Sequence, residues 1–177
     1  MLQDLVKDIT NWLNFAEAKN IALITFDSAW LTFWLKRFHE NSIKEYKVIY
    51  AFISIIYIVA LIICLISFIP KLFDKNIIEK RLKKSLDKKS SKDNMLFYKD
   101  IFKYSEEEYY KELKDRGLYS KNSIEGSEED INKYEKALVK QIVTLSGITY
   151  KKYYLFNISL VISIIPLVII ILGIIIA

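Results

Sequence analysis

Two long stretches of the chain contain no charged side chain. Residues 48–69 and residues 155–177 consist mostly of aliphatic and aromatic residues. As α-helices they would each be roughly 33 Å long at about 1.5 Å per residue, which is enough to cross the hydrocarbon core of a bilayer. We therefore predict transmembrane helices over residues 48–70 and 155–177.

A third apolar stretch, residues 21–36, is a weaker candidate for a membrane span. It offers only about fifteen apolar-type residues and includes Asp27. Basic residues at both of its ends can extend their charged groups toward the headgroups, and Trp30 and Trp34 can anchor one interface. We expect residues 21–36 to cross, followed by a short external loop over residues 37–47.

Apolar residues recur at helical spacing in the first twenty residues and predict an amphipathic helix over residues 1–20. Trp12 and Phe15 would lie near the level of the lipid headgroups, where aromatic rings are favoured. We expect this helix to lie along the membrane or to enter it. The apolar positions are Leu2, Leu5, Val6, Ile9, Leu13 and Ala16.

The region between the second and third spans, residues 71–154, is polar and predicted to be helical. An amphipathic pattern over residues 72–86 predicts a first helix, and the lysines and serines of residues 88–92 indicate a linker. A second helix is expected over residues 96–116, where Ser105 and Glu108 have the spacing of a capping box, which can mark a fresh helical start. Gly117 would end that helix.

A third and longest helix is predicted to start at Ser127, because this N-cap residue is followed by three acids in the first turn. Apolar side chains recur at three- and four-residue spacing from Ile131 onward, and no strong helix breaker separates them from the span that begins at Leu155. We therefore expect one helix to run from the polar region into the membrane.

The distribution of Lys and Arg predicts the orientation. Two of the 26 basic residues precede Ile21, four lie in residues 36–47, twenty lie in residues 71–152, and none follows. Because cytoplasmic loops carry the excess of basic residues, residues 71–154 should be cytoplasmic. With three spans the N-terminus is also inside. The fold class is thus all-α, an integral membrane protein with about three transmembrane helices and a helical cytoplasmic loop.

The chain lacks the usual parts of an enzyme or a metal site. It has one cysteine, Cys64, and one histidine, His39, which excludes a disulfide framework, a thiolate or His-based metal site and a Ser-His-Asp triad within one chain. No phosphate-binding glycine loop or dinucleotide fingerprint is present. We expect no enzymatic activity, no metal and no cofactor.

Asp27 is the polar residue that most needs an explanation, because a carboxylate in an apolar span is costly. It must find a partner, face water or become neutral. Two interpretations stay open: Asp27 lines a pore or sensor cavity, or it makes a polar packing contact with another helix. Glu17 and Lys19, at the cytoplasmic end of the same helix, could hold a neighbouring helix or contact a ligand.

The basic region is also rich in tyrosine, so it could bind an anionic nucleotide through Lys or Arg contacts to phosphate and ring stacking on the base. A competing interpretation is that basic residues near a bilayer attract anionic lipid without a specific ligand. Nucleic acid is not an expected partner, because fifteen acidic residues accompany the twenty basic ones in this region.

Three segments carry a resemblance to a known family. Ala16-Glu17-Ala18-Lys19 precedes the apolar residues 21–29, in which Asp27 takes the place of a polar residue. Residues 94–98 (Asn-Met-Leu-Phe-Tyr) precede the acidic, tyrosine-containing residues 105–109. Before the last span come Gln141-Ile142, Leu145-Ser146 and Lys152-Tyr153. In these segments the sequence resembles the Pycsar effector transmembrane family (PycTM) of bacterial antiphage defence. Lys99 stands where a Gly commonly follows the aromatic pair, and Gln141 replaces a frequent acid.

The resemblance implies a multi-pass effector of the bacterial inner membrane that responds to a cyclic nucleotide made by a partner cyclase. Such an effector would assemble as a homo-oligomer in the lipid bilayer and disrupt the membrane, causing abortive infection. A cyclic mononucleotide is then the expected ligand. Alternatives are a membrane scaffold or accessory subunit whose basic loop binds a protein or anionic lipid, and a small ion-channel component. The candidate ligand contacts are Trp12, Glu17, Lys19, Tyr98, Lys99 and Lys103, and Asp27 is the intramembrane candidate.

Overall fold

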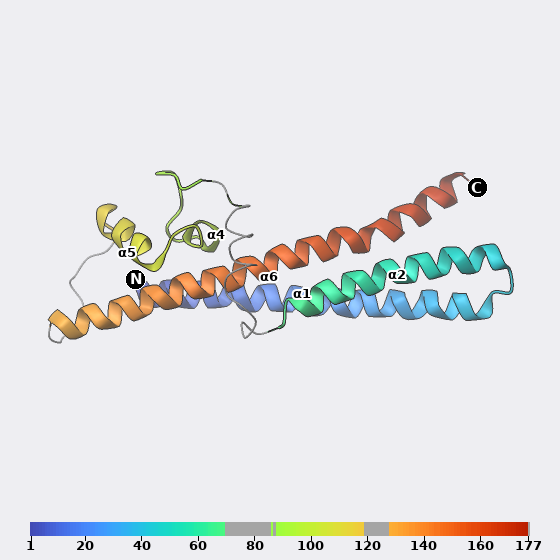
Figure 1. Ribbon diagram of the computed structural model, residues 1–177, viewed down its shortest axis with the longest axis horizontal. Helices are drawn as coiled ribbons and strands as arrows, with labels where there is room; N and C mark the ends of the chain where they lie inside the picture. The colour runs from blue at the N-terminus through green and yellow to red at the C-terminus, as the bar shows by residue number, and fades with distance from the viewer. Residues whose placement is uncertain (70–85, 87, 119–127, 177) are drawn as a thin grey trace. The chain divides into compact units, whose positions relative to one another are not determined.

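The computed structural model describes residues 1–69, 86, 88–118 and 128–176, and every regular element in these ranges is a helix (Figure 1). The expected all-α class is confirmed. The described helices are α1 (Leu2–Glu40), α2 (Lys44–Ile66), α4 (Tyr98–Ile101), α5 (Glu106–Asp115) and α6 (Glu128–Ile176). Residues 72–85 of the helix predicted over residues 72–86, and the N-cap predicted at Ser127, lie outside the described residues.

The chain divides into two compact units. Unit 1 comprises Met1–Phe15 and Lys71–Lys151, and unit 2 comprises Ala16–Pro70 and Lys152–Ala177. Helices α1 and α6 contribute residues to both units.

Helix α1 replaces two elements that the sequence analysis treated separately, the amphipathic helix 1–20 and the span 21–36. Ala16 and Ala18, close to the expected border, are strong helix formers, and residues 2–40 contain no Gly or Pro. Asn20 does not cap a new helix, because its side-chain amide donates to the backbone oxygen of Ala16, one turn back (3.0 Å). The helix therefore continues through residue 20 without interruption.

The expectation that the N-terminal helix lies along the membrane or enters it stays a prediction, and what the structure shows is the packing of the apolar stripe of this helix. Leu2, Leu5 and Ile9 are buried in the core of unit 1, so protein covers the apolar stripe that would have faced lipid. The amphipathic pattern was interpreted correctly as a helix with one buried face, but that face packs against protein. The core of unit 1 also contains Met95, Ile101, Tyr104, Tyr109, Leu113, Val139 and Ile142.

The helix predicted over residues 96–116 is two helices, α4 and α5, separated by a turn. The break occurs at Ser105, whose capping box with Glu108 is confirmed. The Ser105 hydroxyl accepts from the Glu108 amide (3.3 Å), and the Ser105 amide donates to the Glu108 carboxylate (2.8 Å). The predicted end of the helix at Gly117 is also confirmed, because this residue has a left-handed φ of 63°.

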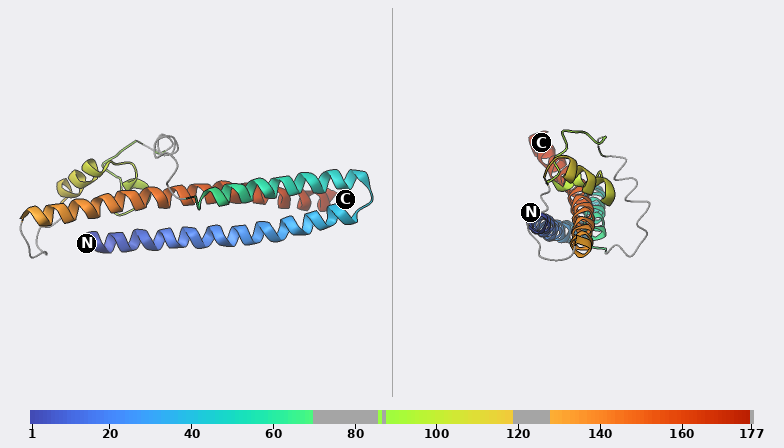
Figure 2. Two further views of the ribbon diagram at one scale, coloured as in Figure 1. Left: turned by 60° about the horizontal axis from the view of Figure 1, so that its bottom comes forward. Right: turned by 90° about the vertical axis from the view of Figure 1, so that its left-hand side faces the viewer.

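In unit 2, three helical segments lie side by side, with α2 antiparallel to α1 and α6. The loop between α1 and α2 covers only residues 41–43, shorter than the predicted 37–47, because both helices extend into it (Figure 2). From one end to the other, the contacts that join the helices involve Glu17, Phe68 and Lys152; Asn20, Cys64 and Ser159; Asp27 and Ser163; and Trp34, Tyr50 and Ile170.

Among the described helices, two are long and apolar enough to cross a membrane: Lys44–Ile66 and Lys133–Leu172. They cover residues 48–66 and 155–172 of the two strong spans predicted from the sequence. Many of their large apolar side chains are exposed, including Phe52, Ile55 and Val161. Such continuous apolar exposure is unusual for a soluble monomer and is typical of a surface that meets lipid or another protein.

Candidate functional site

Asp93 is the centre of a buried polar network in unit 1. Its carboxylate accepts hydrogen bonds from the Lys103 ammonium (2.8 Å), the Tyr104 hydroxyl (2.9 Å) and the Ser90 amide (3.0 Å). Its backbone oxygen accepts from the Arg116 guanidinium (2.7 Å). One residue thus connects segment 88–92, the turn after α4 and the end of α5.

Lys103 lies between two carboxylates, Asp93 and Asp100, and its ammonium is 2.8 Å from each. The side chains of Lys103 and Asp93 are only 7% exposed. Burial alone would lower the pKa of Lys103, but the carboxylates of Asp100 and Asp93 outweigh it and raise that pKa. Burial also opposes ionisation of Asp93, yet hydrogen bonds from Lys103, Ser90 and Tyr104 hold its pKa below the ordinary value. Asp93 and Lys103 therefore both stay charged at neutral pH.

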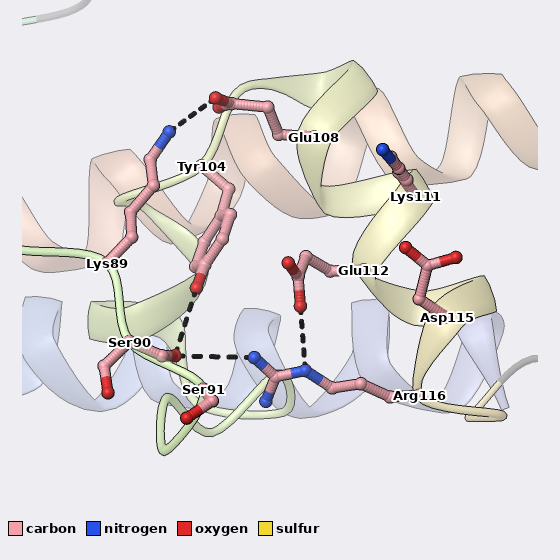
Figure 3. A pocket seen from close by; sticks show the side chains of 9 residues that line it. All are labelled: Lys89, Ser90, Ser91, Tyr104, Glu108, Lys111, Glu112, Asp115 and Arg116. Atoms are coloured by element: carbon pink, nitrogen blue, oxygen red, sulfur yellow. Dashed lines mark hydrogen bonds and ion pairs between the residues drawn. The ribbon is translucent and has the colours of Figure 1, made fainter.

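Beside this network lies a hollow of about 490 Å³, between segment 89–91 and helix α5 (Figure 3). Tyr104 contributes a buried wall, and its pKa is raised to about 12 by burial and by the neighbouring Asp93. The lining contains three basic and three acidic side chains. It consists of Lys89, Ser90, Ser91, Tyr104, Glu108, Lys111, Glu112, Asp115 and Arg116.

Four of the six charged side chains that line the hollow form two ion pairs. Lys89 pairs with Glu108 at 2.6 Å, and Arg116 pairs with Glu112 at 2.9 Å. Hydrogen bonds from Lys89 and from Ser105 lower the pKa of Glu108 from 4.5 to about 2. Lys111 and Asp115 make no hydrogen bond or ion pair within the described part of the chain (Figure 3). Both charged side chains line the same hollow.

An aromatic cluster forms a second feature of unit 1. The ring of Trp12 lies 5.8 Å from Phe97 and 5.5 Å from Tyr98, measured between centroids, and the last two rings are 4.6 Å apart. Lys99, the next residue, is exposed and has no hydrogen bond or ion pair with any described residue. The cluster ties the N-terminal part of α1 to the start of α4.

Unit 2 has a polar seam between its helices. Asp27 is fully buried, and one of its oxygens accepts a hydrogen bond from the Ser163 hydroxyl at 2.9 Å. Its other oxygen has no partner among the described residues, and the same is true of the Tyr57 hydroxyl. Farther along, the Cys64 thiol lies 3.3 Å from the hydroxyl of Ser159. Of the two interpretations of Asp27, this geometry favours the polar packing contact.

At one end of the seam, Glu17 pairs with Lys152 at 3.1 Å. The ammonium of Lys19 lies over the rings of Tyr153 and Phe156, at 5.5 and 5.7 Å from their centroids. Both residues therefore hold α6 against α1, which was one of the two roles expected for them.

The candidate ligand contacts fall into two groups. Trp12, Tyr98, Lys99 and Lys103 belong to unit 1, whereas Glu17 and Lys19 belong to unit 2. Within unit 1, Trp12 and Tyr98 are in contact, Lys99 is exposed, and the Lys103 ammonium is held by two acids. Sequence reasoning missed Asp93 and Arg116. Asp93 follows a lysine- and serine-rich run, a common setting for a solvated acid, so only the fold distinguishes it.

The described residues contain no group of three or more His, Cys, Asp or Glu side chains that could hold a metal ion. What the arrangement offers is a charged hollow in unit 1 and a helical, outwardly apolar unit 2.

Comparisons with known proteins agree with this arrangement. A family model described as the Pycsar effector protein domain (PycTM) matches residues 1–177, the whole chain. No curated protein and no solved structure matches the chain. The matched family implies a membrane effector in antiphage defence. With its full length matched, the chain belongs to the Pycsar effector family.

Proposed function

We propose that this protein is an inner-membrane effector that responds to a cyclic mononucleotide, made by a partner cyclase, by self-assembling and disrupting the membrane. The observation that carries the proposal is the pairing of two different units in one chain. Unit 1 has a preformed charged hollow, and unit 2 has an apolar exterior around packed helices. Membership of the Pycsar effector family supplies the biological setting and the cyclase partner.

Three spans, including part of α1, fit unit 2 best. The α1 segment lies alongside α2 and α6 from Glu17 to Trp34, a length of roughly 26 Å at about 1.5 Å per residue. Asp27 does not prevent insertion, because it is fully buried and bonded to Ser163. The excess of Lys and Arg in residues 71–154 then assigns this region to the cytoplasm.

Self-assembly is supported by the outward face of α1 in unit 2. Small side chains recur there at alternating four- and three-residue spacing, and all of them are exposed. A face that met only lipid would be expected to carry large aliphatic residues, whereas small residues let two membrane helices approach closely. We assign this stripe to contact with a second copy. Its members are Ala18, Ala22, Thr25, Ala29 and Thr32.

A breach of the membrane requires more than one copy. Side chains fill the contact between the three helices of unit 2, where Ala16, Tyr57 and Ala60 are fully buried. Three thin spans enclose no useful channel by themselves, so a pore or a disrupted patch has to form between copies. Asp27 faces the interior of its own chain, which makes an ion-channel component with Asp27 in its pore the weaker alternative.

The ligand must favour one arrangement of the protein over another, because binding shifts an equilibrium only by its difference in affinity for the two states. Helices α1 and α6 offer the connection, since each contributes residues to unit 1 and to unit 2. A change in how α5 packs against these helices within unit 1 would alter the exposed face that meets another copy.

Dye uptake in bacteria tests the proposal. Cells that express the chain together with its cyclase should take up a membrane-impermeant dye after the cyclase is activated. Cells with a catalytically inactive cyclase, or with the cyclase alone, should remain sealed. Membranes that stay intact despite high expression and abundant cyclic nucleotide would reject the proposal and favour a scaffold or accessory subunit.

A further inference from the structure

We infer that the hollow between segment 89–91 and α5 is the binding site for the phosphate and ribose of a mononucleotide. The inference rests on the proposed response to a cyclic nucleotide and assigns its site. None of the six ligand contacts predicted from the sequence, Trp12 and Tyr98 among them, lines this hollow.

The hollow has a suitable size and a fixed floor. Its volume of about 490 Å³ lies within the range of about 300 to 1,000 Å³ that is common for small-molecule sites. Two of its lining residues, Ser90 and Tyr104, are held in place by hydrogen bonds that they donate to the Asp93 carboxylate. A site whose supporting groups are already held by other contacts binds without having to order them first.

Two unpartnered charges identify the chemistry of the ligand. Lys111 and Asp115 are one helical turn apart on α5, and neither has a partner within the described residues (Figure 3). A Lys ammonium is a suitable donor to phosphate oxygens. A carboxylate is a suitable acceptor for ribose hydroxyls, the role acidic residues have in many nucleotide sites. A ligand that carries both groups would satisfy both residues.

The balance of charge restricts the ligand further. Three basic and three acidic side chains line the hollow, so its formal charge is zero. A neutral lining disfavours polyphosphates and nucleic acid, because each added negative charge meets the carboxylates of Glu108, Glu112 and Asp115. A cyclic phosphodiester carries a single negative charge. The lining therefore favours a cyclic mononucleotide over nucleoside triphosphates and inorganic phosphate.

Ligand binding would also change the protein contacts. Lys89 pairs with Glu108 at the edge of the hollow, and the two side chains are 44% and 50% exposed. A phosphate that approaches Lys111 can compete for Lys89 and weaken its pair with Glu108. Since Lys89 belongs to segment 88–92 and Glu108 to the first turn of α5, occupancy of the hollow would move these segments relative to one another.

Binding measurements on the full-length protein in detergent test the site. The ligands are the four 3′,5′-cyclic mononucleotides, the corresponding 5′-monophosphates and inorganic phosphate. The variants are Lys111→Gln and Asp115→Asn, whose side chains are exposed and unpartnered, so neither substitution should unfold the protein. Lys140→Gln is the matched control, because it removes the same charge from an exposed position of α6 in unit 1. Thermal unfolding of each variant verifies folding.

The wild-type protein and the Lys140→Gln variant should bind at least one cyclic mononucleotide with the same Kd. The Kd should rise by about tenfold in each hollow variant, as expected for loss of a charge-assisted hydrogen bond. Equal affinity in the wild type and both hollow variants would overturn the assigned site and leave the proposed function intact. Equal binding of inorganic phosphate and cyclic nucleotide would overturn the nucleotide assignment. Absence of nucleotide binding, together with no cyclase-dependent dye uptake, would overturn the proposed function itself.

Discussion

The Ser163 hydroxyl donates a hydrogen bond to the Asp27 carboxylate across 2.9 Å, although the two residues are 136 positions apart in the chain. The bond joins α1 to α6 inside unit 2, and the Ser159 backbone oxygen is an alternative acceptor at the same distance. Loss of the hydroxyl leaves a fully buried carboxylate without a side-chain partner. We expect Ser163→Ala to reduce stability by about 1 kcal/mol, the usual size of such bonds between membrane helices.

A double-mutant cycle that combines Ser163→Ala with Asp27→Ala checks this expectation, with unfolding by sodium dodecyl sulfate as the measurement. An Asn side chain keeps an acceptor for the Ser163 hydroxyl, so Asp27→Asn should be milder than Asp27→Ala. Ser54→Ala is the control, because the Ser54 hydroxyl bonds only to the Tyr50 backbone oxygen of its own helix (2.8 Å). Additive effects of Ser163→Ala and Asp27→Ala would contradict the bond.

The helical class and the two strong spans could be predicted because they depend on local composition. The Ser105 capping box and the Gly117 helix end could be predicted because cap residues act within one turn. The local sequence of a helix does not show whether lipid or protein covers its apolar stripe. The pattern Leu2, Leu5, Ile9 is equally suited to lipid and to a protein core, and only the fold shows that unit 1 buries it.

Gly147 gives a second prediction. A Cβ atom added there would lie 2.7 Å from the Phe102 ring, which is itself buried. The clash should cost about 1 to 3 kcal/mol. It is partly offset by the gain of about 0.5 to 1 kcal/mol that Ala brings to a helix interior over Gly. We expect Gly147→Ala to lower the unfolding temperature.

The matched background for this test is Phe102→Leu, which removes the ring. In that background the clash disappears and the helix-propensity gain remains, so Gly147→Ala should become neutral or stabilising. A similar loss of stability in both backgrounds would show that Phe102 is not the cause.

Acid should weaken unit 1 through Glu108. Hydrogen bonds from Lys89 and Ser105 lower its pKa from 4.5 to about 2 in the folded protein. Because the folded pKa is the lower one, this contribution is complete above pH 4.5 and is lost as the pH falls from 4.5 to about 2. The effect is small, since Lys89 and Glu108 are both about half exposed.

Chemical unfolding between pH 2 and pH 6 measures this contribution. Glu108→Gln should lose part of the pH dependence seen in the wild-type protein over this window. Glu107→Gln, which changes a neighbouring exposed acid of α5, should retain it. Identical profiles for all three proteins would rule out the contribution of Glu108.

Substitutions in the outward stripe of α1 should impair membrane damage without impairing the folding of a single chain. Ala22→Leu and Ala29→Leu enlarge exposed residues, so the stability of a single chain should change little. They should reduce cross-linking between copies and cyclase-dependent dye uptake. Val161→Leu enlarges an exposed residue of α6 outside the stripe and serves as the control. Unchanged cross-linking in both stripe variants would assign the contact to another face.

The orientation can be measured with single cysteines, because the native Cys64 is buried and unique. In a Cys64→Ser background, a membrane-impermeant maleimide should label a Ser42→Cys variant in intact cells. A Ser91→Cys variant should be labelled only after the membrane is opened. Labelling of Ser91→Cys in sealed cells would reverse the proposed topology.

The candidate site was the least predictable part, for a physical reason. Lys103 is one of many lysines in a basic region, and only the fold surrounds it with Asp93 and Asp100. Lys111 is a lysine of the same region that has no hydrogen bond or ion pair with any residue that the structure describes. The number of acids within reach of each ammonium distinguishes a structural lysine from an available one, and this number depends on contacts between segments.

Asp93 holds segment 88–92, the turn after α4 and the end of α5 with one side chain and one backbone oxygen. We therefore expect these three pieces to loosen together. A disturbance that frees any of them removes a donor that the others rely on to keep the carboxylate satisfied. If the small molecule prefers the loosened arrangement, its binding should then produce an abrupt response instead of a graded one.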